Sequence, residues 1–182
     1  MGKNDQGLNK GRQRYQTVLR VLVFLRNGSD VLLLKGAPDK TIWANLYNGV
    51  GGHVEAEEDI LSAARREVLE ETGLEVDELA LRAVVNIDVG NPLQGILMFA
   101  FVGWVDRRET VASAEGALDW IAADEVTQHG LVEDLYWLLP RVLALSATAP
   151  PLYLHYRYDG ADRLVIRTAA DIEHTPRGDL KG

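Results

Sequence analysis

The sequence contains no cysteine, no long apolar run and no excess of basic residues. Without cysteine the chain can form no disulfide framework, no thiolate metal site and no cysteine nucleophile. No stretch approaches the roughly 18 consecutive apolar residues that a membrane-spanning helix requires. Because 27 aspartate and glutamate residues outnumber 19 lysine and arginine residues, we also expect no general basic surface for nucleic acid polymers.

The composition that remains is that of one globular domain. Apolar residues make up 47% of the 182 residues, which is close to the average for folded proteins. We expect residues 15–168 to form the domain, because no repeat or linker divides them. The polar segment 1–14 has no apolar signal-peptide core and is expected to be flexible, and the patternless segment 169–182 is expected to be a mobile tail. These features fit a cytoplasmic protein and leave a homodimer open.

The predicted elements alternate in a way that gives a mixed sheet flanked by helices. Strands are predicted where large apolar and β-branched residues concentrate, and turns where glycine, asparagine, aspartate and proline cluster. The predicted strands are residues 17–26, 31–34, 79–87, 96–105, 118–121, 153–158 and 164–168. Helices are predicted at residues 59–72 and 131–145, with a kink at Pro140. The fold class is therefore α/β (α+β).

The acidic residues concentrate in one block of the chain. Between Gly52 and Glu78 there are ten acidic and two basic residues, so this block carries a charge equal to the net −8 of the whole chain. On its predicted helix, Glu67, Glu70 and Glu71 share one face. Three carboxylates near a helix C-terminus repel one another and oppose the helix dipole. A divalent cation would relieve both effects, and a set of oxygen ligands favours Mg²⁺, with Mn²⁺ as the second choice.

The spacing within this block matches a known motif. Five residues separate Gly52 from Glu58, and seven more precede Arg66. The residues that follow at fixed spacing are Glu67, Val68, Glu70, Glu71, Gly73 and Leu74. The segment resembles the Nudix box, Gly-x5-Glu-x7-Arg-Glu-U-x-Glu-Glu-x-Gly-U with U aliphatic, at every specified position. The resemblance implies a Nudix-type α-β-α sandwich, with a mixed β-sheet between helices, and a Mg²⁺-dependent enzyme that hydrolyses a nucleoside diphosphate linkage.

The wider segment 46–74 is similar to the MutT-type branch of that family, the pyrophosphohydrolases of oxidised purine nucleoside triphosphates. Segments 132–140 and 153–166 are similar to the mammalian members of the branch. The implied reaction converts a purine nucleoside triphosphate, such as 8-oxo-dGTP, to its monophosphate and pyrophosphate. The alternatives are an ADP-ribose or nucleotide-sugar pyrophosphatase, and a Nudix module that senses a nucleotide without cleaving it.

The resemblance also implies the ligands of the metal ion. Glu70 and Glu71 match the main carboxylate ligands, and the Gly51 carbonyl matches a backbone ligand. Glu67 matches a carboxylate that binds the metal or acts as the general base, so we predict that it is catalytic.

A second group of motif residues is implied to support these ligands. Arg66 matches the residue that orients the glutamates through an ion pair, and Glu58 matches an acid that supports this pairing. Gly52 and Gly73 are predicted to be structural.

One more metal-binding carboxylate is expected from a loop that follows the central strands. Glu115 is the first choice for this ligand, with Glu109 and Asp119 as second choices. An ordinary solvated loop acid is the alternative interpretation. The four histidines show no spacing that indicates another metal site.

Three residues are expected to bind the purine base by the same resemblance. Asn48 matches a base-contacting asparagine, and Glu133 and Asp134 match a pair of acids at the purine edge. Each also has a simpler interpretation, a turn residue for Asn48 and an acidic helix start for the pair. The aromatic residue expected before the acid pair is replaced by Leu131, so Trp43 is the other candidate for a stacking platform.

Overall fold

The computed structural model describes residues 13–170 and 172–177. The predicted flexible segment 1–14 lies outside these residues except for its last two positions, and so do residues 171 and 178–182 of the predicted tail. The structure therefore leaves the mobility expected of both ends as a prediction.

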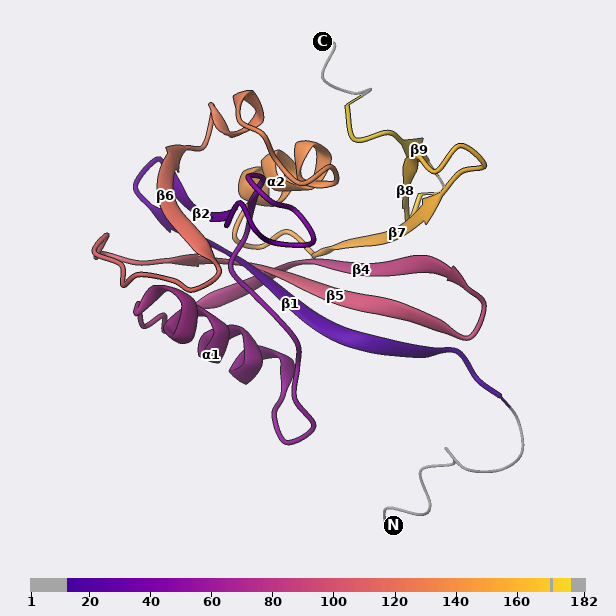
Figure 1. The fold of residues 1–182 in the computed structure, drawn as a ribbon, viewed down its shortest axis with the longest axis horizontal. Helices are drawn as coiled ribbons and strands as arrows, with labels where there is room; N and C mark the ends of the chain where they lie inside the picture. Colours follow the sequence, from indigo (N-terminus) through magenta and orange to yellow (C-terminus); the bar gives the residue numbers. More distant parts are fainter. Residues whose placement is uncertain (1–12, 171, 178–182) are drawn as a thin grey trace.

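One mixed sheet of nine strands dominates the described residues (Figure 1). The strands are β1 (Gln16–Asn27), β2 (Asp30–Gly36), β3 (Tyr47–Asn48), β4 (Leu79–Asn91), β5 (Gln94–Trp104), β6 (Gly116–Ala122), β7 (Leu152–Tyr158), β8 (Leu164–Thr168) and β9 (Glu173–His174). Their order is β3-β2-β1-β5-β4-β7-β8-β9, and β6 also pairs with β2. The β1–β5 and β4–β7 pairs are parallel, and the other pairs are antiparallel.

The helices α1 (Ile60–Thr72) and α2 (Leu135–Ala144) lie on opposite faces of this sheet (Figure 1). Each helix covers its own apolar core. Ala64 and Val68 of α1 pack with buried residues of β1 such as Val23, while Trp137 and Leu138 of α2 belong to the core on the other face. The α-β-α sandwich expected from the sequence is therefore confirmed. No helix in the described part of the chain is long and apolar enough to cross a membrane.

Local sequence determines where α1 begins and ends. Asp59 precedes the helix, and its carboxylate accepts hydrogen bonds from the amides of Leu61 at 2.8 Å and Ser62 at 3.0 Å, as an N-cap does. Gly73 follows the helix with φ of 71° and donates its amide to the Leu69 carbonyl, which is the left-handed C-terminal cap. The prediction of a helix over residues 59–72 is confirmed.

The second predicted helix is wrong at its start. α2 begins at Leu135 rather than at Leu131, because the preceding segment pairs with β3. Tyr47 donates its amide to Gly130 O at 2.8 Å, and Val132 donates to Tyr47 O at 3.0 Å. A backbone already committed to these bonds cannot enter a helix. The strand β9 is a second difference, since the sequence predicts no element there.

The glycine-rich segment after β3 runs antiparallel along β1, which fixes its position. Val23 donates its amide to Val50 O at 2.7 Å, and Val21 donates to Gly52 O at 2.9 Å. A Cβ atom at Gly51 would lie 2.1 Å from the Val21 carbonyl oxygen. Only glycine therefore permits this close approach, and the approach holds the segment between β1 and the start of α1.

Candidate active site

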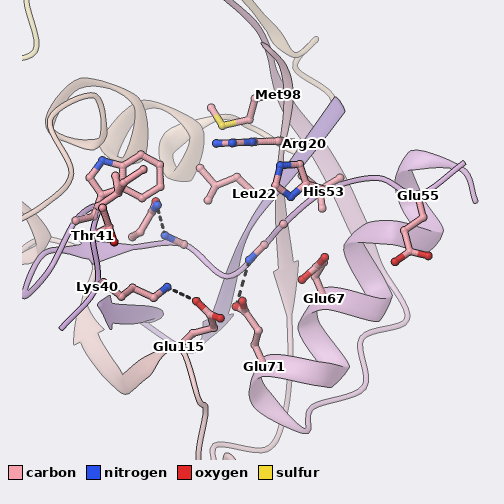
Figure 2. A pocket seen from close by; sticks show the side chains of 17 residues that line it. Arg20, Leu22, Lys40, Thr41, His53, Glu55, Glu67, Glu71, Met98 and Glu115 are labelled. Atoms are coloured by element: carbon pink, nitrogen blue, oxygen red, sulfur yellow. Dashed lines mark hydrogen bonds and ion pairs between the residues drawn. The ribbon is translucent and has the colours of Figure 1, made fainter. Parts of the chain in front are cut away.

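A cavity of about 660 Å³ opens where the glycine-rich segment, β1 and α1 meet. In Figure 2, Glu67, Glu71 and Glu115 lie on its lower side with Lys40 beside Glu115, and Arg20, Leu22, His53 and Met98 lie above them. The lining residues are Arg20, Val21, Leu22, Lys40, Thr41, Ile42, Trp43, Asn48, Gly49, Gly51, Gly52, His53, Glu55, Glu67, Glu71, Met98 and Glu115. Gly52 of the motif and two of the three motif glutamates on α1 thus share one cavity with Asn48 and Trp43.

Glu67 lies directly against the backbone of Gly52. A Cβ atom at Gly52 would lie 2.4 Å from the Glu67 Oε1 atom, so no side chain fits there while the glutamate keeps its position. The predicted structural role of Gly52 has this steric basis, because the missing side chain makes room for the Glu67 carboxylate.

Glu71 is the most perturbed acid of the cavity. Its Oε2 atom accepts a hydrogen bond from the Gly51 amide at 3.3 Å. Burial raises the pKa of Glu71 to about 7, and the negative charges of Glu67 and Glu115 raise it further than the nearby Lys40 lowers it. A bound cation would stabilise the charged form of a carboxyl group that is buried and also lies near other carboxylates.

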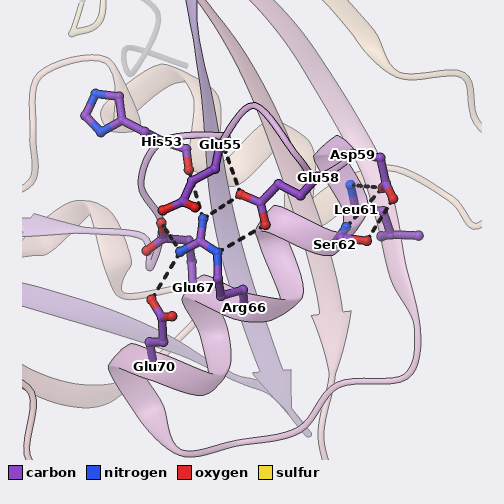
Figure 3. A network of polar contacts seen from close by, with 9 residues as sticks. All are labelled: His53, Glu55, Glu58, Asp59, Leu61, Ser62, Arg66, Glu67 and Glu70. Carbon is purple, nitrogen blue, oxygen red and sulfur yellow. Dashed lines mark hydrogen bonds and ion pairs between the residues drawn. The ribbon is translucent and has the colours of Figure 1, made fainter.

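Arg66 holds the acidic residues together (Figure 3). Its guanidinium donates two hydrogen bonds to Glu58, at 2.7 and 3.1 Å, and one to Glu67 Oε1 at 2.9 Å. A further bond at 3.0 Å reaches the carbonyl oxygen of His53. These contacts lower the pKa of Glu58 and raise that of Arg66. The arrangement joins the loop after Gly52 to two turns of α1, as expected for a positioning residue.

Glu70 is not placed like its two partners. Its side chain is 58% exposed, and its Oε2 atom accepts a bond from Arg66 at 3.1 Å rather than lining the cavity. In the described part of the chain no three acidic or histidine side chains are close enough to form a ready metal site. The metal-binding roles of Gly51, Glu67, Glu70, Glu71 and Glu115 therefore stay predictions.

Of the three loop acids proposed as an additional ligand, Glu115 is the one that lines the cavity. It forms an ion pair with Lys40, which comes from the loop after β2. Glu109 pairs with Arg107 at the surface, and Asp119 accepts a hydrogen bond from Tyr47 at 2.8 Å. The structure thus brings Glu115, but neither alternative, beside Glu71.

The wall opposite the carboxylates carries the residues suited to a base. Asn48 accepts a hydrogen bond from the Gly49 amide at 2.9 Å through its Oδ1 atom, which orients the amide group and leaves its Nδ2 hydrogens without a partner among the described residues. Trp43 lines the same cavity and is 45% exposed. Leu131 is only 2% exposed and belongs to the core, so Trp43 is the aromatic side chain available for stacking.

Glu133 and Asp134 lie just before α2 and do not line this cavity. Glu133 is exposed. Burial raises the pKa of Asp134 to about 7, and the charge of Glu133 raises it further. The hydroxyl of Tyr156 is buried near Asp134, and no described group bonds to it with normal geometry. Neither acid lines the cavity that contains Asn48, and the base-binding role of the pair stays a prediction.

Sequence reasoning assigned no role to several lining residues, of which Arg20 and His53 are the polar ones with the clearest chemistry. The sequence does contain a signal for Arg20, because a charged residue interrupts an otherwise apolar strand in the run VLRVLVFL. His53 directly follows Gly52. It reaches the cavity only because this segment pairs with β1, and the sequence alone does not predict that pairing.

The donor set of the cavity fits a hard divalent cation. Glu67, Glu71 and Glu115 offer carboxylate oxygens, and this is the chemistry that Mg²⁺ and Mn²⁺ prefer. Burial, and after it the charges of Glu67 and Glu115, raise the pKa of Glu71, so a cation bound here would favour its charged form.

Comparison with known proteins gives the same picture. Residues 16–142 match the NUDIX domain. An oxidized purine nucleoside triphosphate hydrolase of Danio rerio is 43% identical over 162 residues, covering 87% of this chain and 98% of the relative. The protein of that name in Mus musculus is 34% identical over 158 residues, covering 85% of this chain and 96% of the relative.

A crystal structure of a mutator MutT protein from Bacillus halodurans superposes with a TM-score of 0.71 at 25% identity, covering 85% of this chain and 99% of that one. Nudix proteins typically depend on a divalent metal ion. Because the domain match spans most of the chain and both relatives are covered almost completely, this chain belongs to the Nudix family and is a Nudix hydrolase.

Proposed function

We propose that this protein hydrolyses a purine nucleoside triphosphate, with an oxidised purine such as 8-oxo-dGTP preferred, to the monophosphate and pyrophosphate. The observation that carries the proposal is the presence of Asn48 and Trp43 in the same cavity as Glu67 and Glu71. The base of a nucleotide can then contact the Asn48 amide and the Trp43 indole. The phosphates of the same nucleotide reach the carboxylates on α1. Both curated relatives bear the name of this activity over almost their whole length.

Mg²⁺, or Mn²⁺ in its place, would be held by Glu67, Glu71 and Glu115, with the Gly51 carbonyl as a backbone ligand. Glu70 would join them only by giving up its ion pair with Arg66. When bound, the cation neutralises phosphate charge and lowers the pKa of a coordinated water.

The residues of the chain provide the remaining parts of the reaction. Glu67 accepts a proton from the attacking water as the water oxygen bonds to phosphorus in the linkage between the α- and β-phosphates. The bond from that phosphorus to the bridging oxygen breaks, and the monophosphate and pyrophosphate separate. Arg66 fixes one oxygen of Glu67 at 2.9 Å, so the other oxygen is available to the proton. Gly52 leaves the space that this carboxylate occupies.

The base is recognised by groups on the other wall. The Asn48 amide offers a donor and an acceptor to the purine edge, and Trp43 offers a flat apolar surface for stacking. Glu133 and Asp134 would add contacts to ring N–H groups only if the substrate reaches past Asn48 toward α2. Because nucleoside triphosphates are cytoplasmic metabolites, this substrate also favours a cytoplasmic protein that acts on small molecules and needs no nucleic acid or membrane partner.

The test is kcat/KM for 8-oxo-dGTP, dGTP and ADP-ribose in the wild type and in Asn48→Ala. We expect the variant to lose about 1–3 kcal/mol of transition-state stabilisation for the purine triphosphates, because their polar edge loses its partner. Turnover of an inorganic or base-poor diphosphate is expected to change little, because it presents no purine edge. Asn91→Ala in the turn between β4 and β5, outside the cavity, is the matched control and should behave as wild type.

Two results would contradict the proposal. Equal losses on all three substrates would show that Asn48 only shapes the loop through its bond to Gly49. If the wild type prefers ADP-ribose, the substrate is a nucleotide diphosphate ester rather than a purine triphosphate.

A further inference from the structure

Arg20 lacks the polar partners that other cationic side chains at the site have. Lys40 is paired with Glu115, and Arg66 is bound to acids of the motif. Arg20 lines the cavity, yet its Nε atom is buried without a hydrogen-bond partner, and its side chain forms no ion pair within the described residues. A buried donor without a partner costs free energy, so this guanidinium is a candidate for binding an anionic group that enters from outside the chain.

The backbone fixes where Arg20 stands. Arg20 and His53 face each other in an antiparallel bridge between β1 and the glycine-rich segment, and directly opposed residues of such a bridge lie on the same face. His53 follows Gly52, against which the Glu67 carboxylate packs. The guanidinium and the imidazole therefore line the same cavity as the Glu67 carboxylate, on the side of the cavity away from Glu71, as Figure 2 shows.

A second groove, of about 450 Å³, continues from this point along β1 and β5. Arg20 and His53 line both spaces. The other side chains of the second groove, such as Gln16, Thr17 and Gln94, carry no charge. Arg20 and His53 thus lie where the cavity opens into the groove. The other residues that line the groove carry no positive charge.

We propose that Arg20, with His53 beside it, binds the terminal phosphates of the substrate, the part of the nucleoside triphosphate that leaves as pyrophosphate. The proposal rests on the function proposed above. A planar guanidinium matches two phosphate oxygens at once, and its neighbour adds one N–H donor. The uncharged groove beyond Arg20 gives the released pyrophosphate a way out and indicates that the chain of phosphates ends here. Arg20 would therefore set the preference for triphosphates over diphosphates.

The direct test is binding of inorganic pyrophosphate by isothermal titration calorimetry, in the presence of Mg²⁺, to the wild type and to Arg20→Gln. We expect the variant to bind at least about tenfold more weakly, because hydrogen bonds between charged groups are lost. Arg26→Gln is the matched control. Arg26 lies on the same strand with an equally unpartnered Nε atom but outside both spaces, and it should bind pyrophosphate within twofold of wild type.

The second arm compares 8-oxo-dGTP with 8-oxo-dGDP. Arg20→Gln should raise KM for the triphosphate at least about tenfold and leave KM for the diphosphate within about twofold. Equal effects on both substrates, or unchanged pyrophosphate binding, would overturn the proposal. If Arg20→Gln does not fold, Arg20→Lys keeps the charge without the planar fork and should still weaken pyrophosphate binding severalfold. A wild type that prefers another nucleotide would contradict the proposed function, while the calorimetric result would still decide the role of Arg20.

Discussion

The helices α1 and α2 begin in different ways. The first turn of α1 is capped by the carboxylate of Asp59, which is its immediate neighbour in sequence. Asp134, at the same position before α2, makes no capping bond with its side chain. Contacts between the segment 130–132 and Tyr47, far away in sequence, fix the start of α2 instead. The acids on α1 are therefore placed by local sequence, and those before α2 by tertiary structure.

This difference separates two parts of the enzyme. The first part consists of the motif acids, which we propose to act on the phosphates together with Glu115 and Arg20. These acids lie on one continuous segment, from Gly51 to Glu71, whose backbone is held by β1 and whose acids are held by Arg66. The second part, which we propose to recognise the base, is assembled from β3, the loop after β2 and the residues before α2. The reaction chemistry of the first part can stay the same while a different geometry of the second part selects a different substrate.

The largest expected effect on kcat follows from removal of a carboxylate that lines the cavity. Glu71→Gln removes a charge at the cavity acid whose pKa is raised by burial, and we expect kcat to fall at least about a hundredfold if a bound cation supplies several kcal/mol. Glu70→Gln is the matched control, since Glu70 is exposed and bound to Arg66, and it should lose less. Steady-state kinetics with Mg²⁺ and with EDTA would measure both. Equal losses would mean that Glu70 leaves Arg66 when the metal binds.

A smaller effect is expected from a single added methyl group. Gly52→Ala would place its Cβ 2.4 Å from a Glu67 oxygen, so the carboxylate has to move, and we expect kcat to fall about tenfold or more because positioning of this group is lost. Gly160→Ala, in the turn between β7 and β8 where nothing lies within 4 Å, should keep full activity. A Gly52→Ala enzyme as active as wild type would show that Glu67 need not sit against the loop.

The smallest effect concerns the acid before α2. The pKa of Asp134 is about 7 in the folded protein, against an ordinary value of 3.8. An acid whose pKa is raised by folding stabilises the protein fully below the unfolded value, and this contribution is lost as pH rises through the folded value. The contribution of Asp134 to the melting temperature should therefore fall between about pH 4 and 7, and Asp134→Asn should remove this contribution from the curve. The Glu133→Gln variant serves as the control because Glu133 is exposed; an unchanged slope in Asp134→Asn would contradict the burial of the acid.

The sequence predicts the first part of the enzyme well because its determinants are local. Asp59, Gly73 and the spacing of the glutamates define α1, and the glycine at position 52 has a steric reason that the motif already implies. The spacing of apolar residues over 131–145 predicts a helix that starts too early. The backbone hydrogen bond between Val132 and Tyr47 holds the first residues of this segment outside the helix. Arg20 and Lys40 could not be assigned, since their positions depend on which loops meet across the sheet.

The acidic block has a further consequence for how fast a nucleotide can arrive. Residues 52–78 carry a charge equal to the net charge of the chain, and Glu55, Glu67 and Glu71 line the cavity (Figure 2). A free nucleotide, itself an anion, meets a patch of its own sign. Added salt shortens the range of this repulsion to about 8 Å at physiological ionic strength, so the association rate should rise with salt, the reverse of the behaviour of a protein steered toward nucleic acid. The fastest route to the complex is therefore one in which the divalent ion arrives before the nucleotide or together with it.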